Sequence, residues 1–490
     1  MTRIKRILFI TTNLFTITFA NNSSFFVSGY VDYSYISRLS DGSVIDIPYR
    51  MASLNFEKRG KNIDLKGSFA LEYHLRDDSY FLESSNPQDF ILDFRELYAT
   101  YISSNFEFRI GRQIQAWGNV DENSPVDNVS PIDYYYMFFS GTDRKMASLS
   151  TAMDIYFGNL KLSTVFSPLH STNRLPLGDD DFPVELPVYP EPWEIFPISS
   201  NPHEIGVRGV WSTNLFDISA SYFSGYDRIF NFKGANVYRT KATGQIKESA
   251  DLVFGYRKTN IFGFGFTFIN DYFNIRFDAG LFNTIDMDKS IERDYPGTPV
   301  AIHPALGGGF QYDSLAFSYP IQEEATYMQS TIQFEIELPF QINLIAQYFE
   351  HHLSNYSAVD TLPDVTIDIP GFEYDPEEMS PQDFFIPGMG VPIAILTDKA
   401  TFISLGKNLF DDQFNISFTS MIDLAKYQYI NGIAGNLLEY KLTYSIEQNL
   451  KCILALTKVN GNKNHPDQDN YQFNRMENFS HGRIEIKYFF

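Results

Sequence analysis

The stretch Arg483-Ile-Glu-Ile-Lys-Tyr-Phe-Phe490 at the end of the chain decides the fold. Successive side chains of an extended strand point to opposite faces, so its even-numbered residues, all large and apolar, share one face. Its charged residues, at positions 483, 485 and 487, share the other face. In water the apolar face needs a hydrophobic partner, whereas in a bilayer it meets lipid while the charged face lines a wet interior. The stretch therefore predicts a membrane-spanning strand.

The same alternation, with a period of two residues, recurs along the chain. It is clear in residues 63–75, 328–338, 414–424 and 438–446, where charged side chains are confined to one face. Phenylalanine and tyrosine are abundant, with 46 and 31 copies, and suit lipid-facing positions and interfacial girdles. No segment reaches the ~20 consecutive apolar residues of a transmembrane helix. A chain without spanning helices can still cross a membrane as a closed barrel, because closure gives every strand two neighbours.

The connections between these strands predict a single all-β, antiparallel up-and-down barrel. Tight turns are expected near residues 60–61, 104–105, 158–159, 213–214, 270–271, 339–340, 411–412 and 448–449. Longer polar segments alternate with them, at about 38–48, 77–89, 116–144, 168–203, 227–254, 286–322, 354–396, 425–434 and 460–478. This alternation is typical of barrels with short periplasmic turns and long extracellular loops. It predicts about 18 strands, an even number, with 16 as the alternative because two segments are weak strands.

The N-terminus is typical of a secretory signal peptide. Three basic residues among the first six precede a mostly apolar stretch, and Thr18-Phe19-Ala20 is an acceptable cleavage site. The alternative is a short membrane anchor, for which the apolar run is too brief. We predict a signal peptide over residues 1–20 and an outer-membrane barrel domain over residues 21–490.

Charge and cysteine content exclude several classes of function. A formal net charge of -22 argues against nucleic acid as a partner and against binding to anionic lipid surfaces. The one cysteine, Cys452, allows neither an internal disulfide nor a thiolate metal cluster. The chain has no Gly-x-Ser-x-Gly motif, and none of its eight histidines has a motif-like partner, so we expect no enzyme, cofactor or metal site. The acidic long loops are interpreted as solvated surface, with Ca²⁺ or Mg²⁺ ties to lipopolysaccharide as the alternative.

Two elements resemble known families. A terminal aromatic residue after such alternation resembles the closing strand of bacterial outer-membrane β-barrels, where it serves as a signal to the barrel assembly machinery. The hairpin from Arg95 to Gln113, with Ala116-Trp-Gly118, resembles porin-like families that include alginate-export and phosphate-selective porins. Asn128-Val-Ser-Pro-Ile-Asp133 narrows the resemblance to a porin-like family of unknown function. The chain carries Asn119 where this resemblance predicts an acidic residue.

The segment that follows this hairpin is the candidate pore constriction. The alternation is clean through Ile110 and fails after Gly111, as a bend toward the lumen would require. Barrels of about 16 to 18 strands leave an open aqueous channel, which such a loop can narrow. Acidic groups facing arginines across the lumen would filter solutes by charge, and the alternative is that Arg112 only pins the loop. The candidate residues are Arg109, Arg112, Asp121, Glu122, Asp127, Asp133 and Arg144.

The resulting functional hypothesis is a porin-like channel of the bacterial outer membrane that passes small solutes passively. Inward positions mix both charges, and the acidic loops favour a weak preference for cations. One alternative is a channel for hydrophobic or lipid-like compounds, with an apolar lumen around residues 134–139. Another is a non-transporting structural or adhesion barrel with acidic surface loops. Expected partners are outer-membrane lipid, lipopolysaccharide, the assembly machinery and small solutes, and a homo-oligomer is left open.

Overall fold

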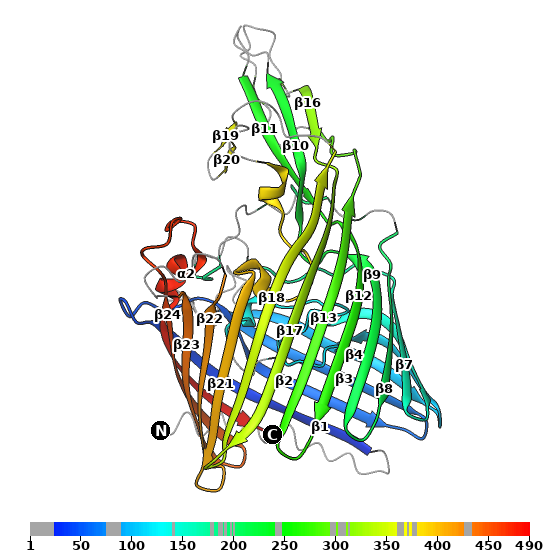
Figure 1. Cartoon of the computed structure of the whole chain (residues 1–490), viewed down its shortest axis with the longest axis vertical. Helices are drawn as coiled ribbons and strands as arrows, with labels where there is room; N and C mark the ends of the chain where they lie inside the picture. The colour runs from blue at the N-terminus through cyan, green and yellow to red at the C-terminus, as the bar shows by residue number, and fades with distance from the viewer. Residues whose placement is uncertain are drawn as a thin grey trace.

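In the computed structural model the chain forms a closed barrel with an extension at one end (Figure 1). The described residues are 24–74, 90–139, 143–176, 181–184, 190, 194–196, 198, 201–240, 247–294, 300–301, 310–311, 314–359, 367–369, 372–374, 380–425 and 434–490. The predicted signal peptide and much of the acidic loop sequence lie outside these residues.

One sheet of 18 antiparallel strands forms the barrel, which confirms the predicted strand count. Each strand pairs with its neighbour along the barrel, and β1 pairs with both β2 and β25, so the sheet closes. The strands are β1 (Ser24–Arg38), β2 (Pro48–Arg59), β3 (Ile63–His74), β4 (Phe90–Ile102), β5 (Phe106–Gln113), β6 (Ser148–Phe157), β7 (Leu160–Ser167), β8 (Glu204–Ser212), β9 (Phe216–Tyr226), β12 (Lys258–Ile269), β13 (Phe273–Asp286), β17 (Glu323–Leu338), β18 (Ile342–Ala358), β21 (Lys399–Leu409), β22 (Phe414–Asp423), β23 (Asn436–Glu447), β24 (Leu450–Asn460) and β25 (His481–Phe489).

The two faces of the barrel wall differ as the alternation predicts. On β25, Ile484 and Ile486 are 48% and 49% exposed, whereas Arg483 and Glu485 are 6% and 9% exposed. Large apolar side chains are likewise exposed on the outside of most other strands, for example Ile110, Phe262 and Leu454. Among the described residues, no helix is long and apolar enough to cross a membrane. A closed even-stranded barrel with an apolar outside and a polar inside is the outer-membrane type, which places the protein in the bacterial outer membrane.

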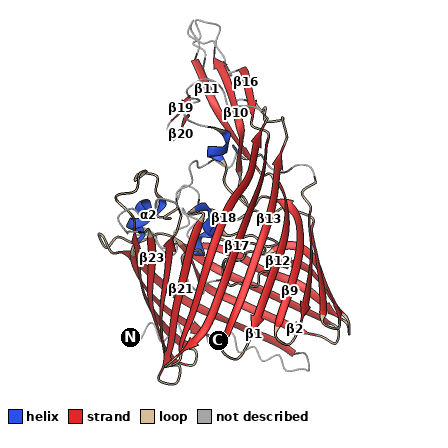
Figure 2. Ribbon diagram, viewed as in Figure 1, coloured by secondary structure: helices blue, strands red, loops and turns tan. Residues whose placement is uncertain are grey.

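Short turns gather at one end of the barrel, where the C-terminus also lies, and the long connections gather at the other end (Figure 2). The turn between β17 and β18 shows how tight these are. Phe340 and Gln341 have φ of 68° and 58°, the left-handed pair of a hairpin turn whose twist matches the flanking strands.

Three of the expected polar loops contain strands, which corrects that part of the prediction. The strands β10 (Asn231–Thr240), β11 (Lys247–Gly255) and β16 (Ser314–Pro320) form a three-stranded sheet that extends beyond the barrel (Figure 1). Their pairing to one another, and not to the barrel, could not be read from local alternation. The smaller elements are β14 (Val300–Ala301), β15 (Phe310–Gln311), β19 (Ile367–Ile369), β20 (Phe372–Tyr374), α2 (Gln472–Arg475) and the 3₁₀ turns η2 (Tyr134–Tyr136), η5 (Pro381–Phe384), η6 (Pro392–Ile395) and η8 (Met476–Phe479).

The closing seam joins the last residue to the first strand. Gly29 and Phe490 exchange two backbone hydrogen bonds, each with an N···O distance of 3.0 Å. A Cβ on Gly29 would overlap the Ser53 carbonyl oxygen and the Phe490 ring, so only glycine fits where the ring covers the strand.

We therefore expect Gly29→Ala to destabilise the barrel by about 1–3 kcal/mol, since a backbone atom must move to admit the methyl group. The matched control is Gly209→Ala on β8, where an added Cβ has no atom within 4 Å and the change should stay within about 0.5 kcal/mol. Urea unfolding of the refolded protein in lipid vesicles measures both variants. Equal unfolding midpoints would contradict the role given to the seam.

Candidate functional site: a loop across the barrel lumen

The connection between β5 and β6 lies inside the barrel over its described residues, 114–139 and 143–147; we call it the crossing loop. It leaves the wall at Gln113 and contacts inward-facing side chains on distant strands: Asp278 on β13, Gln333 on β17 and Gln347 on β18. These strands lie several positions around the barrel from β5 and β6. The loop therefore spans the lumen and narrows it.

The Trp117-Gly118 pair positions the start of the crossing loop. The Trp117 ring is 4% exposed and packs on Gly206 of β8, where any Cβ would overlap the ring. A Cβ on Gly118 would overlap the side chain of Ser124 in the returning arm. Gly206 thus lets the Trp117 ring pack closely on the wall, and Gly118 lets the two arms of the loop approach each other.

Asp278 is the main acceptor for the first arm of the loop. Its carboxylate accepts from the Asn119 backbone N–H at 2.7 Å, the Asn119 Nδ2 at 2.7 Å, the Val120 N–H at 3.0 Å and the Ser124 Oγ at 2.7 Å. The Asn119 Oδ1 in turn accepts from Arg208 at 3.0 Å. An ionised aspartate could not donate to Asp278, which explains physically why asparagine fits at position 119.

The tip of the loop is bound to the wall by side-chain amides. Asp121 accepts from Gln333 Nε2 at 2.8 Å and pairs with Arg276 at 2.8 Å, while its backbone N–H donates to Gln333 at 2.9 Å. Gln347 donates to the Asp121 carbonyl at 2.8 Å and accepts from Asn123 at 2.9 Å. The polar inward positions of β17 and β18 thus satisfy the peptide groups of a loop that water cannot fully reach.

Two ion pairs join the arms of the loop. Arg144 pairs with Glu122 at 2.6 Å, and Lys145 pairs with Asp127 at 2.5 Å. Glu122 is the more accessible carboxylate, with 47% of its side chain exposed, and it has a φ of 62°, rare for a residue with a side chain. Its charge faces the lumen beside that of Arg144.

The second arm is bound to the opposite wall around Glu72 of β3. Glu72 accepts from Tyr136 at 3.0 Å and pairs with Arg174 at 2.6 Å, and Arg174 also pairs with Asp133 at 3.1 Å. Burial raises the pKa of Asp133 to about 6, against the opposing effect of Arg174. Its negative charge is therefore present at neutral pH and is lost as the pH falls below about 6.

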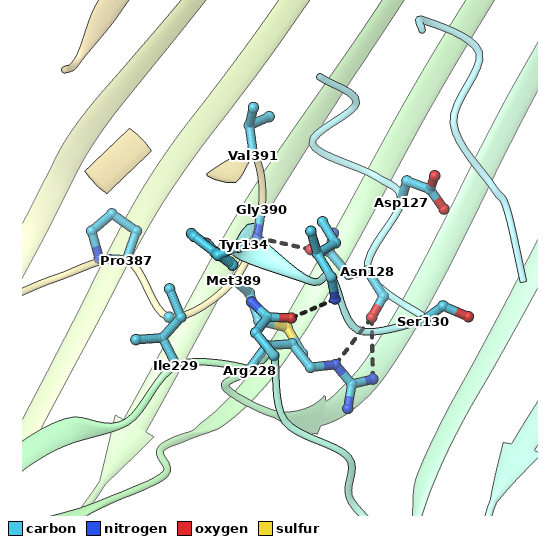
Figure 3. A pocket seen from close by; sticks show the side chains of 13 residues that line it. Asp127, Asn128, Ser130, Tyr134, Arg228, Ile229, Pro387, Met389, Gly390 and Val391 are labelled. Atoms are coloured by element: carbon cyan, nitrogen blue, oxygen red, sulfur yellow. Dashed lines mark hydrogen bonds between the residues drawn. The ribbon is translucent and has the colours of Figure 1, made fainter. Parts of the chain in front are cut away.

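The Asn128–Asp133 element forms a junction with a second inward-folding segment, residues 380–398. Arg228 donates to the Asn128 carbonyl, and the Asn128 Oδ1 accepts from the Gly390 N–H at 2.8 Å (Figure 3). Arg228 also donates to the Val129 carbonyl. The cavity there measures only about 10 Å³, about the space of one water molecule. This motif therefore holds loops together and offers no room for a solute.

The two predicted arginines of β5 lie elsewhere. Arg109 faces inward but pairs within the wall, with Asp154 at 3.0 Å and Glu107 at 3.6 Å. Arg112 stands opposite Leu97 and Leu149 in the ladder, both exposed on the outer face. Its Nε donates to a backbone carbonyl of β4, so Arg112 lies on the outside of the wall and is removed from the constriction set. The parity of Phe106, Phe108 and Ile110 already indicated this face.

Sequence reasoning did not identify which inward wall residues bind the loop. Their only sequence signal is a polar residue at an inward strand position, which many strands share. They are Glu72, Arg208, Arg276, Asp278, Gln333 and Gln347, and a further partner, Arg174, lies in the connection after β7.

Open space remains between the crossing loop and the wall strands β21 to β23, β25, β1 and β2. One cavity of about 270 Å³ lies against β25, β1 and β2, and another of about 80 Å³ lies against β21, β22 and β23. Glu122 and Arg144 line the smaller cavity. The loop thus narrows the lumen and leaves gaps between itself and these strands.

No family model and no curated protein matches the chain. Among solved structures, OccAB4 of Acinetobacter baumannii is 11% identical with a TM-score of 0.45, covering 96% of this chain and 98% of that one. OpdK of Pseudomonas aeruginosa, solved with vanillate, is 9% identical with a TM-score of 0.44, covering 95% and 98%. OmpF of Salmonella typhi, solved with daunomycin, is 8% identical with a TM-score of 0.38, covering 95% and 97%. Likenesses this distant carry no inference about the solute.

We expect Asp278→Ala to free the tip of the crossing loop, because it removes the acceptor of four hydrogen bonds at once. Hydrogen exchange at the Asn119 and Val120 amides should speed up by about ten- to a hundredfold. The matched control is Asp154→Ala, another buried wall carboxylate, which pairs with Arg109 and Lys161. Mass-spectrometric exchange of peptides from residues 116–126 measures both, and equal protection in the two variants would contradict the anchoring role.

Proposed function

We propose that this protein is a porin-like channel for the passive passage of small solutes across the outer membrane. The observation that carries the proposal is the crossing loop, a polar segment bonded across a closed barrel that narrows the lumen without filling it. Solutes would pass between this loop and the wall strands β21 to β25, β1 and β2, where the two cavities lie.

The predicted charges take distinct roles in this proposal. Asp127 and Asp133 hold the loop through Lys145 and Arg174, so they act as structural pairs. Glu122, with its exposed carboxylate beside Arg144, is the group that a passing ion would meet. We retain the expectation of a weak cation preference, supported by the acidic extracellular loops.

A channel for apolar compounds is the second candidate, and one feature favours it. Tyr134, Tyr135, Tyr136 and Phe139 of the crossing loop belong to a buried apolar cluster that includes residues from several other loops. Low ion conductance together with release of an apolar fluorophore from protein-containing vesicles would support this candidate over a hydrophilic channel.

Several further expectations stay proposals. They are a relation to alginate-export and phosphate-selective porins, recognition by the barrel assembly machinery, contact with lipopolysaccharide and a possible homo-oligomer. The proposed function involves no catalysis, cofactor or metal ion.

Planar-bilayer recording of the refolded protein tests the proposal. We expect discrete conductance steps and a reversal potential in a salt gradient that indicates cation preference. Glu122→Gln should move the reversal potential toward the anion side, because it removes the accessible charge at the narrowing.

The matched control is Glu107→Gln, an inward wall carboxylate paired with Arg109, which should leave the selectivity nearly unchanged. Conductance near zero, even after deletion of residues 116–144, would instead support a non-transporting structural barrel. A clearly anion-selective wild-type channel would contradict the charge assignment.

A further inference from the structure

The larger of the two cavities beside the crossing loop is a built chamber with its own chemistry. It measures about 270 Å³, close to the lower range of small-molecule pockets. Inward residues of β25, β1 and β2 form one side, and Tyr136, Phe139 and Asp143 of the crossing loop form the other. We call it the seam chamber, because it lies beside the closing strand pair.

The charges of the seam chamber balance. Three cationic and three anionic side chains line it, so the chamber as a whole has no formal net charge and gives no overall preference to a simple cation or anion. They are Arg50, Arg483 and Lys487, and Asp32, Asp143 and Glu485.

Buried donors and one buried acceptor in the chamber have no hydrogen-bond partner among the described residues. The donors are one terminal nitrogen of Arg50, Arg483 Nε and Arg50 Nε, which is 3.6 Å from Glu72 in an ion pair without a hydrogen bond; the acceptor is Asp32 Oδ1. Arg50, Arg483 and Asp32 are 8%, 6% and 7% exposed. Leaving a buried polar atom without a hydrogen bond is unfavourable. A polar solute that forms hydrogen bonds with these atoms would therefore be stabilised in the chamber.

The charged groups are held in place by contacts on their other sides. The Arg50 guanidinium lies 4.2 Å from the Tyr136 ring centre and donates to the Asp143 carbonyl at 2.5 Å. The Arg483 guanidinium lies 5.0 Å from the Phe139 ring centre and pairs with Glu485 at 2.5 Å. Because stacking and pairing already orient these groups, little ordering remains to be done when a solute binds.

Opposite charges stand on neighbouring strands. Val31 lies opposite Ala52 in the β1–β2 ladder, so Asp32 and Arg50 are within about two positions of each other across the strands. The other Asp32 oxygen is 3.5 Å from Lys487, which leaves Oδ1 available. A carboxylate oxygen without a hydrogen bond therefore stands near guanidinium nitrogens that also lack one.

We infer that the seam chamber binds a small zwitterionic solute of the size of an amino acid, with its carboxylate on the guanidinium donors of Arg50 and Arg483 and its ammonium group on Asp32. Guanidinium donors match a planar carboxylate, and the carboxylate of Asp32 matches an ammonium group. This assignment rests on the proposed channel function, because it names the solute class that the lumen would favour.

Calorimetric titration of the refolded full-length chain in detergent tests the assignment with L-glutamine as the probe. N-acetyl-L-glutamine keeps only the negative charge, and L-glutaminamide keeps only the positive charge. We expect each of these analogues to bind about tenfold more weakly or worse than L-glutamine, since each loses one charge-assisted contact.

Two variants test which residue binds the ammonium end of the solute and which binds the carboxylate end. Asp32→Asn should erase the advantage of L-glutamine over N-acetyl-L-glutamine, and Arg50→Gln should erase its advantage over L-glutaminamide. Each comparison is made within one variant, so a general loss of folded protein does not produce the expected pattern. Arg109→Gln, an inward arginine outside the chamber, is the control and should preserve both advantages.

Bilayer recording on the same preparations separates this inference from the proposed function. A conducting channel that binds none of the three probes, or binds all three equally, would overturn the chamber assignment and leave the porin intact. Binding of D-glucose in place of L-glutamine would also overturn it, in favour of a neutral polyhydroxylated solute. Selective L-glutamine binding by a barrel that does not conduct would uphold the chamber and overturn the channel.

Discussion

The structure depends on one constraint: every peptide N–H and C=O group at membrane depth needs a partner within the protein. A sheet meets it only by closing, since an open edge would leave a row of unpaired groups in lipid. Here the closure is the pairing of β1 with β25, completed by the reciprocal bonds of Gly29 and Phe490. Because closure creates an inside and an outside, each strand must then be apolar on alternate residues, which is the pattern of the whole chain.

The same constraint shapes the lumen. Eighteen strands enclose more space than their own side chains fill, so a loop can enter. A loop that enters brings its own peptide groups into partial burial, and they need partners as the strands do. Asp278, Gln333 and Gln347 supply those partners from inward positions of three strands. The crossing loop is therefore specified as much by the wall opposite as by its own residues.

The division of charge follows from this arrangement. Pairs such as Lys145 with Asp127 and Arg174 with Asp133 hold backbone segments in place. Because their opposite charges largely cancel, they exert only a weak electrostatic force on a solute. Beside the gaps in the lumen, Glu122 is accessible, and in the seam chamber nitrogens of Arg50 and Arg483 and one oxygen of Asp32 have no hydrogen-bond partner among the described residues. We therefore assign function to the charged groups that stay accessible or lack a hydrogen bond.

The sequence by itself determined the strands, their faces, the turns and the membrane, because alternation and turn chemistry act between near neighbours in the chain. It also placed Asp121, Glu122, Asp127, Asp133 and Arg144 in one loop. It could have excluded Arg112, whose parity with Ile110 puts it on the outer face. Only the tertiary structure decided that this loop binds β13, β17 and β18, that Asn119 bridges Arg208 and Asp278, and that β10, β11 and β16 form a separate sheet. The physical reason is that these partners lie far apart in sequence and meet only once the barrel has closed.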